Sequence, residues 1–287
     1  MKIVVLGKSG QVAQALQRLA SDELEVLAWG RAEADLLDAP ALAAKIEQAS
    51  PDAVINAAAY TAVDLAETEP EAADDLNHKA VAIIGQIAKL QNIPLVHIST
   101  DYVFEGTGTS PKSPDDPTGP ISVYGRSKLA GEQALTKIGG RYAILRTSWV
   151  FSEDGNNFVK TMLRLGKEKD TLTIVADQIG GPTSAADIAS ACVTMAMTMA
   201  SEPALSGIWH YSGTNDCSWS DFATEIFHQA GIECAVTPIP TSEYPTPAKR
   251  PLNSRLDCRK TFTDFGIERP QWKQSLAQVL RNLGELA

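Results

Sequence analysis

The chain has 287 residues, 44% hydrophobic and 21% charged, a balance typical of a globular protein and not of a disordered one. Its formal net charge of −10 argues against a general attraction to nucleic acid or acidic membranes, so any phosphate-bearing ligand must be held by a local site. The four cysteines form no C-x-x-C pair, which favours reduced thiols over disulfides or a metal site.

The chain starts with MKIVVLG, an apolar run too short for a signal peptide. No apolar run approaches the roughly 20 residues that a membrane-spanning helix needs. We therefore expect a cytoplasmic protein with no membrane partner.

The first half of the chain alternates short apolar runs with helical patterns. Strands are predicted over residues 3–6, 26–28, 53–57, 94–98 and 142–146, and helices over residues 11–20, 41–49, 71–90 and 124–136. Continuous apolar strands are typical of a parallel sheet buried on both faces, and the β-α alternation implies right-handed crossovers. We predict an α/β fold with a Rossmann-type doubly wound parallel sheet in residues 1–150. In residues 151–287 the regular rhythm weakens, which predicts a smaller C-terminal lobe, with chain exchange between the two parts.

The first predicted strand runs directly into GKSGQVA at residues 7–13. Gly7 permits a tight turn, and Gly10 lets the backbone approach a pyrophosphate because it has no Cβ. The next helix, starting near Gln11 and Val12, offers free N–H groups and the positive end of its dipole to phosphates. A plain strand-to-helix turn is the alternative, but the position in the first βα unit favours a dinucleotide site, and these four residues are predicted contacts.

The spacing G-x-x-G-x-x-A resembles that of the extended short-chain dehydrogenase/reductase superfamily. An NAD enzyme usually has a carboxylate at the end of the second strand, whereas this chain has Arg31, which can pair with the 2′-phosphate of NADPH. We therefore favour NADPH, with NADH as the alternative cofactor and a surface arginine beside Glu33 as the competing interpretation. The superfamily places an acidic residue after its third strand near the adenine, which implies that role for Asp35 and Leu36.

Residues 56–60 (NAAAY) close the next strand of the predicted sheet. Small side chains at this point would let the nicotinamide riboside lie against the backbone. Ala58, Ala59 and Tyr60 are therefore predicted cofactor contacts, and a packed core strand is a compatible interpretation.

Tyr124 and Lys128 carry the strongest chemical signal. Residues four apart share one face of a helix, so Lys128 is expected to lower the tyrosine pKa from about 10 and to hold the nicotinamide ribose. Residues 99–104 (STDYVF) end the preceding strand, at the edge where doubly wound sheets bind ligands, and Thr100 can donate a hydrogen bond to the same substrate oxygen. A Y-x-x-x-K pair alone occurs by chance, but this ordered set indicates a proton-transfer site.

Further segments carry a more specific resemblance. They are residues 56–64 (NAAAYTAVD), 99–104 (STDYVF), 124–132 (YGRSKLAGE), 146–150 (RTSWV), 156–165 (NNFVKTMLRL), 177–183 (DQIGGPT) and 245–257 (PTPAKRPLNSRLD). Together with the glycine turn, they resemble the dTDP-4-dehydrorhamnose reductase family, from residue 1 to the final predicted helix.

This resemblance implies an enzyme that uses NAD(P)H to reduce the C4 keto group of dTDP-4-dehydro-β-L-rhamnose to dTDP-β-L-rhamnose, the final step of dTDP-rhamnose biosynthesis for cell-surface polysaccharide. Tyr124 would protonate the C4 oxygen, Thr100 would tune that transfer and bind the sugar, and Lys128 would hold the ribose. The C-terminal lobe would help to bind the nucleotide sugar.

The resemblance also implies substrate contacts outside this set. Asp101 and Trp149 would contact the rhamnosyl ring, although Trp149 can also be read as a core tryptophan after a strand. Arg250 would bind the diphosphate because guanidinium matches phosphate in a bidentate way, with a solvated basic turn as the alternative. Asn253 and Ser254 would belong to the same polar loop.

Some family members have a carboxylate on the first helix that takes part in a metal-linked dimer contact, and this chain has Ala15 there. We therefore predict no metal site, while a homodimer through another surface stays open. A nucleotide-sugar dehydratase or epimerase shares the fold, but such dehydratases have Asp-Glu after the threonine, whereas Asp101-Tyr102 follows it here. A non-catalytic regulatory subunit that binds dinucleotide is the second alternative.

Overall fold

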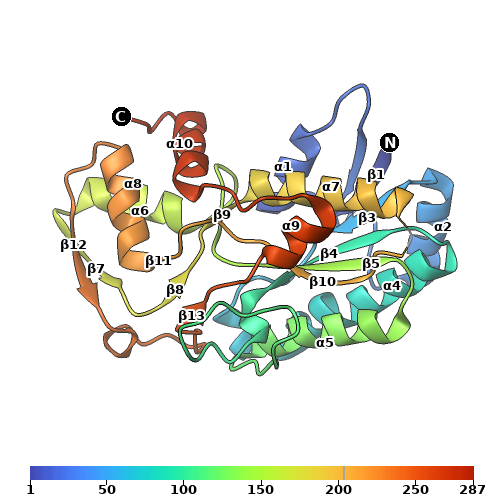
Figure 1. The fold of residues 1–287 in the computed structure, drawn as a ribbon, viewed down its shortest axis with the longest axis horizontal. Helices are drawn as coiled ribbons and strands as arrows, with labels where there is room; N and C mark the ends of the chain where they lie inside the picture. The colour runs from blue at the N-terminus through green and yellow to red at the C-terminus, as the bar shows by residue number, and fades with distance from the viewer. Residues whose placement is uncertain (203) are drawn as a thin grey trace.

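The structure is a computed structural model that describes residues 1–202 and 204–287. Its centre is a six-stranded parallel sheet in the order β10-β5-β4-β3-β1-β2 (Figure 1). These strands are β1 (Lys2–Leu6), β2 (Glu25–Trp29), β3 (Ala53–Asn56), β4 (Leu95–Thr100), β5 (Tyr142–Thr147) and β10 (Gly207–His210). The predicted α/β class with a Rossmann-type parallel sheet is confirmed. The strand order reverses between β1 and β3, and ligands of such sheets bind at the carboxyl ends beside this point.

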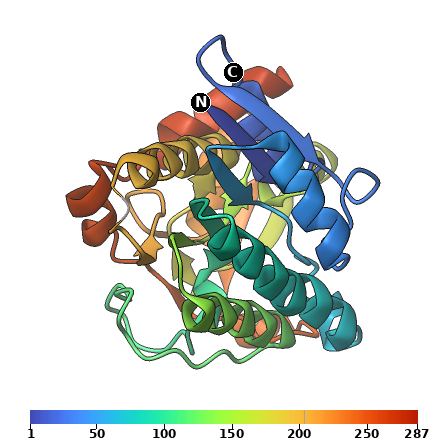
Figure 2. The same ribbon diagram turned by 90° about the vertical axis from the view of Figure 1, so that its right-hand side faces the viewer.

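The alternation of side chains along β1 explains the layers. Ile3 and Val5 face one side, in a core cluster shared with helices α1 (Gln11–Arg18) and α7 (Ala185–Ser201). Val4 and Leu6 face the other side, in a cluster shared with α2 (Ala39–Ala49), α4 (Ala80–Leu90) and α5 (Val123–Ile138). Figure 2 shows helices on both faces of the sheet. Because both faces are covered, residues 3–6 of β1 are all apolar rather than alternating with polar residues.

The helix predicted over residues 71–90 is built from three pieces. It consists of α3 (Pro70–Asp74), a π-helical turn (Asp75–Lys79) and α4. Asn77 in the π-helical turn is buried and bonds both the backbone of Tyr60 and the Ser127 hydroxyl, so the irregular turn aims a polar group into the packing of α5.

The second lobe packs around its own apolar cluster, which joins Phe151, Phe222 and Trp272 with neighbouring side chains. Its helices are α6 (Phe158–Glu168), α8 (Trp219–Gln229) and α10 (Trp272–Leu283), and its strands are β6 (Val150–Phe151), β7 (Thr171–Val175), β8 (Ile179–Gly180), β9 (Thr183–Ser184), β11 (Cys217–Ser218), β12 (Ala235–Ile239) and β13 (Asn253–Ser254). Short 3₁₀ turns occur at Leu65–Glu67, Asp101–Val103 and Thr241–Glu243.

Part of the second half of the chain returns to the sheet. α7 packs against α1, β10 pairs with β5, and α9 (Arg259–Phe265) packs against β10 (Figure 1). These three elements belong with the sheet rather than with the second lobe. The division at residue 150 and the chain exchange stay predictions. In the described part of the chain, no helix is both long and apolar enough to cross a membrane.

Candidate active site

A cleft of about 830 Å³ opens at the carboxyl ends of the central strands, between the sheet and the second lobe. Its lining includes eleven of the predicted site residues, namely Gly10, Gln11, Val12, Ala58, Ala59, Thr100, Asp101, Tyr124, Lys128, Trp149 and Arg250. A second hollow of about 450 Å³ is lined by Gly7, Arg31, Asp35, Leu36 and Tyr60, among others. Ala58 lines both, so the two adjoin.

The glycine turn has the shape that a dinucleotide diphosphate needs. Gly7 has φ of +102°, and a Cβ there would lie 3.1 Å from the backbone nitrogen of Ala58. A Cβ on Gly10 would meet no atom within 4 Å, so this backbone borders open space in the cleft. No side chain of residues 1–202 or 204–287 caps the N-terminus of α1, which leaves its first N–H groups available to an anion.

The end of β2 leaves Arg31 exposed at the second hollow. Glu33, its alternative partner, forms an ion pair with Lys8 and accepts a hydrogen bond from the Gly30 backbone at 3.0 Å. Asp35 and Leu36 lie in the loop between β2 and α2, since the described chain forms no additional strand before β3.

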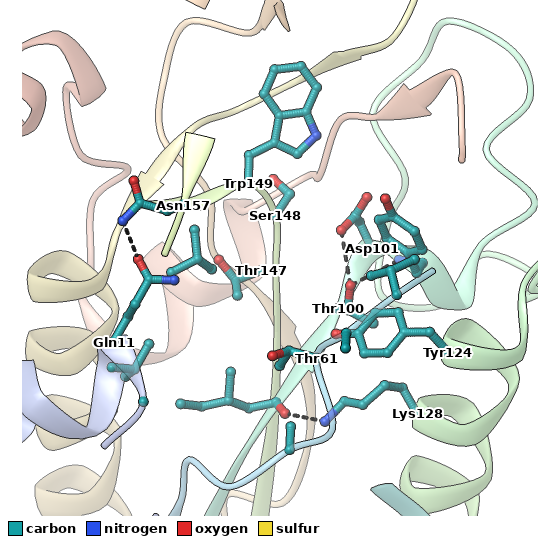
Figure 3. Close-up of a pocket in the computed structure, with 18 of the residues that line it drawn as sticks. Gln11, Thr61, Thr100, Asp101, Tyr124, Lys128, Thr147, Ser148, Trp149 and Asn157 are labelled. Carbon is teal, nitrogen blue, oxygen red and sulfur yellow. Dashed lines mark hydrogen bonds between the residues drawn. The ribbon is translucent and has the colours of Figure 1, made fainter. Parts of the chain in front are cut away.

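The start of α5 sets the position of Tyr124. Ser122 caps the helix by accepting a hydrogen bond from the Gly125 backbone at 3.1 Å. A Cβ on Gly125 would lie 2.3 Å from the carbonyl oxygen of Tyr102, so only glycine lets α5 approach the turn that follows β4. This close approach brings Tyr124 beside Thr100, with Lys128 on the same face of the helix (Figure 3).

Burial dominates the electrostatics of Tyr124. Burial raises the pKa of Tyr124 well above its usual value, and a hydrogen bond with Thr100 opposes this rise only in part. The Lys128 ammonium donates to the carbonyl oxygen of Ile98 at 2.8 Å. The expectation that Lys128 lowers the pKa of Tyr124 stays a prediction. Tyr124 keeps its proton near neutral pH, a state suited to a general acid.

Lys128 is itself almost fully buried, and burial lowers its pKa to about 8, against the opposing effect of Glu132. Its Nζ lies 3.4 Å from Nε2 of His97. The His97 ring is held by Asn56, whose Nδ2 lies 3.1 Å from Nδ1, while Oδ1 of Asn56 accepts from the Ala58 backbone. This support of the lysine by two residues of neighbouring strands was not predicted.

Asp101 is buried at the wall of the cleft. The Thr100 hydroxyl donates to its Oδ1 at 3.1 Å, and Oδ2 has no hydrogen-bond partner among the described residues. Burial raises the pKa of Asp101 to about 6, and the Ser254 hydroxyl opposes this rise. An unpaired buried acceptor at a cleft is suited to a ligand hydroxyl.

Trp149 adopts φ of +50° in the turn between β5 and β6, a strained conformation for a residue with a large side chain. Its ring stacks on Trp219 at the start of α8, with ring centroids 3.6 Å apart and planes 10° apart. The ring of Phe158 packs on the ring of Trp219, with the two ring centroids 4.6 Å apart. Trp149, Trp219 and Phe158 all line the cleft, so the aromatic wall is larger than the single predicted residue.

The residues of the predicted polar loop lie in different surroundings. Arg250 lines the cleft and pairs with Asp64. Asn253 and Ser254 form β13 rather than a loop, and both are buried. Asn253 donates to the carbonyl oxygen of Ser110 at 2.8 Å and does not line the cleft, so the structure gives its amide a role in holding the backbone.

Comparison with known proteins agrees with this geometry. The family model described as the RmlD substrate binding domain matches residues 1–285. A dTDP-4-dehydrorhamnose reductase of Sinorhizobium fredii is 46% identical over an alignment of 286 residues that covers 98% of this chain and 97% of the relative.

The chain belongs to the dTDP-4-dehydrorhamnose reductase family.

Solved structures of the family have the same fold. A dTDP-4-dehydrorhamnose reductase of Clostridium acetobutylicum is 37% identical, with a TM-score of 0.92, over 99% of this chain and 100% of that one. A family member from Bacillus anthracis, solved in complex with NADP, is 34% identical with a TM-score of 0.92 over 98% and 99% of the two chains. The resemblance predicted from the motifs is confirmed.

Proposed function

We propose that the protein reduces the C4 keto group of dTDP-4-dehydro-β-L-rhamnose to dTDP-β-L-rhamnose with NAD(P)H. The observation that carries the proposal is the meeting of Thr100, Tyr124 and Lys128 in one cleft with the glycine turn, in a member of this reductase family. NADPH is the favoured cofactor because the Bacillus anthracis relative was solved with NADP and Arg31 is exposed at the second hollow. NADH remains the alternative.

The residues of the glycine turn and the end of β3 would hold the cofactor. Gly7, Gly10, Gln11 and Val12 would cradle the diphosphate at the N-terminus of α1. Asp35 and Leu36 would lie at the adenine, and Ala58 and Ala59 at the nicotinamide half. Tyr60 lines the second hollow with Asp35 and Leu36, so it would contact the adenine half rather than the nicotinamide. Bound NAD(P)H supplies the hydride that reduces C4.

Tyr124 supplies the proton. Its phenol, kept protonated by burial, would donate to the C4 oxygen as negative charge develops there, so that one hydride and one proton add across the C=O bond. The Thr100 hydroxyl would turn from Asp101 to donate to the same oxygen. Lys128 would bind the nicotinamide ribose and help to restore the tyrosine proton.

Cleft residues outside the catalytic set would bind the sugar and the diphosphate. Asp101 offers its unpaired Oδ2 to a sugar hydroxyl, and Trp149 offers an aromatic face to the deoxysugar. Ser254 would support Asp101 from β13. Arg250 would bind the diphosphate.

A cytoplasmic location and a homodimer remain parts of the proposal. Four free cysteines fit a reducing compartment. Ala15 is buried in the core cluster shared by α1 and α7, so a dimer would use another surface.

The test is Tyr124→Phe. The matched control is Tyr142→Phe, at the amino end of β5 and away from the cleft. Loss of the acid should lower kcat by at least about 10²-fold, while the control should keep its rate. NADPH binding, followed by fluorescence, should survive in both variants. A Tyr124→Phe variant with an intact rate would disprove the assigned proton donor.

A further inference from the structure

Arg250 and Asp64 reach each other from segments far apart in the chain. Asp64 follows β3, Arg250 precedes β13, and both line the cleft. Nη1 of Arg250 donates to Oδ1 of Asp64 at 3.0 Å, and Nη2 donates to Oδ2 at 2.8 Å. The carboxylate therefore engages the end of the guanidinium in a bidentate pair.

The donors of Arg250 can be counted. A guanidinium has five N–H donors, and Nη1 spends its second one on the carbonyl oxygen of Ala248 at 2.9 Å. This leaves the Nε donor and the outer donor of Nη2, for which no described residue is an acceptor. These two donors point from the same edge of the planar group, which is the fork that binds two oxygens of a phosphate.

The backbone around Arg250 is already fixed. Pro251 packs on Gly106, where an added Cβ would lie 2.1 Å from the proline Cβ, and Asn253 donates its backbone N–H to the Gly106 carbonyl at 2.9 Å. On the other side, the Ala248 backbone donates to Oδ1 of Asp64 at 3.1 Å. The side-chain torsions of Arg250 are the remaining freedom, and Asp64 restricts them.

We propose that Asp64 is a positioning residue that holds Arg250 with its Nε and Nη2 edge presented to the diphosphate of the nucleotide sugar. This inference rests on the proposed function for the identity of the ligand. The Arg250 guanidinium holds the pKa of Asp64 below its usual range, so the carboxylate stays ionised at neutral pH. The pair carries no net charge, so Asp64 would strengthen diphosphate binding by lowering the cost of ordering Arg250 and not by adding general attraction.

A simple competition would give the opposite result. If Asp64 only occupied Arg250 until the diphosphate displaced it, removal of the carboxylate would free a positive charge and tighten anion binding. The sign of the change in affinity separates the two roles.

The experiment uses Asp64→Asn and Asp64→Ala in the full chain, with dTDP as the probe in isothermal titration calorimetry. We expect the Kd for dTDP to rise at least about tenfold, and the KM for the sugar nucleotide to rise more than kcat falls. The Kd for NADPH should not change. Arg250→Ala should weaken dTDP binding, and adding Asp64→Ala to it should cost little more, because both changes remove one interaction.

Asp257→Asn is the matched control. Asp257 forms a bidentate pair with Arg259, like the Asp64 pair, but neither residue lines the cleft. This variant should bind dTDP as the wild type does, and thermal unfolding should show that both asparagine variants are folded.

Unchanged or tighter dTDP binding in Asp64→Asn would overturn the inference, as would additive effects of Asp64→Ala and Arg250→Ala. A wild-type protein that binds dTDP but reduces no sugar would contradict the proposed function alone, because the dTDP affinities of the variants would still report on Asp64. A wild-type protein that binds no dTDP would overturn both.

Discussion

A buried ion pair beneath the active site offers a quantitative test of what holds the site in place. Glu132 on α5 and Arg146 on β5 are each 2% exposed. Nη2 of Arg146 donates to Oε2 of Glu132 at 2.6 Å, and Nε donates to Oε1 at 3.0 Å. The Ser99 hydroxyl, next to Thr100, donates to the same carboxylate at 2.5 Å.

Glu132→Ala would leave the Arg146 guanidinium buried without its counter-charge. Breaking such a pair from one side costs about 3–5 kcal/mol. In a chain of this size each kcal/mol corresponds to roughly 2–4 °C, so the melting temperature should fall by about 6–20 °C. The assay is thermal unfolding followed by circular dichroism at pH 7.

Two further variants separate the unpaired charge from other effects. Glu168→Ala removes the exposed i,i+4 partner of Arg164 and should change stability by less than about 1 kcal/mol. Glu132→Leu combined with Arg146→Met removes both charges and should recover most of the loss. A melting temperature of Glu132→Ala equal to that of the wild type, or a double variant as unstable as the single one, would refute this reasoning.

Three other predictions follow from the site. Gly125→Ala places a Cβ 2.3 Å from the Tyr102 carbonyl oxygen and should cost about 1–3 kcal/mol in unfolding assays and lower kcat, whereas Gly119→Ala, with its nearest atom 3.6 Å away, should be neutral. Burial raises the pKa of Asp101 to about 6, so the folded protein binds more protons than the unfolded chain between about pH 4 and 6 and loses stability as pH rises through that window. Asp101→Asn should therefore have a free energy of unfolding at pH 7 up to about 3 kcal/mol above that of the wild type, and this difference should close near pH 4. A difference that does not depend on pH would contradict this reasoning. Arg31→Asp should raise the KM for NADPH more than for NADH, and an unchanged ratio of the two KM values would remove Arg31 from cofactor selection.

The sheet and the catalytic set could be predicted because their signals are local. Apolar runs such as residues 3–6 specify strands buried on both faces, and helical periodicity alone places Tyr124 and Lys128 on one face. The glycine turn is equally local, since the strand, the turn and the helix are consecutive in the chain.

The remaining features depend on contacts between distant segments. β10 has only four residues and finds its place by pairing with β5. Asp64 and Arg250 lie 186 positions apart, and neither segment alone indicates the other. The π-helical turn at Asp75–Lys79 interrupts a helical pattern that shows no break in the sequence.

Spacing in the sequence could not predict the surroundings of Tyr124. Spacing on a helix shows that a charge can approach the phenol, but not how deeply the phenol is buried or what else competes for the ammonium. In the folded chain burial dominates the tyrosine pKa, and the Ile98 carbonyl takes a donor of Lys128. The stack of Trp149 on Trp219 was missed for the same reason, because α8 comes from the second lobe.

The most direct test of the central claim is NADPH oxidation by the purified protein, followed at 340 nm, with dTDP-4-dehydro-β-L-rhamnose as substrate. The control substrate is the unepimerised dTDP-4-dehydro-6-deoxy-D-glucose. The account predicts oxidation that requires the L-rhamno sugar and yields dTDP-β-L-rhamnose. No oxidation of NADPH or NADH, by protein that still binds the cofactor, would contradict it and favour a non-catalytic regulatory subunit.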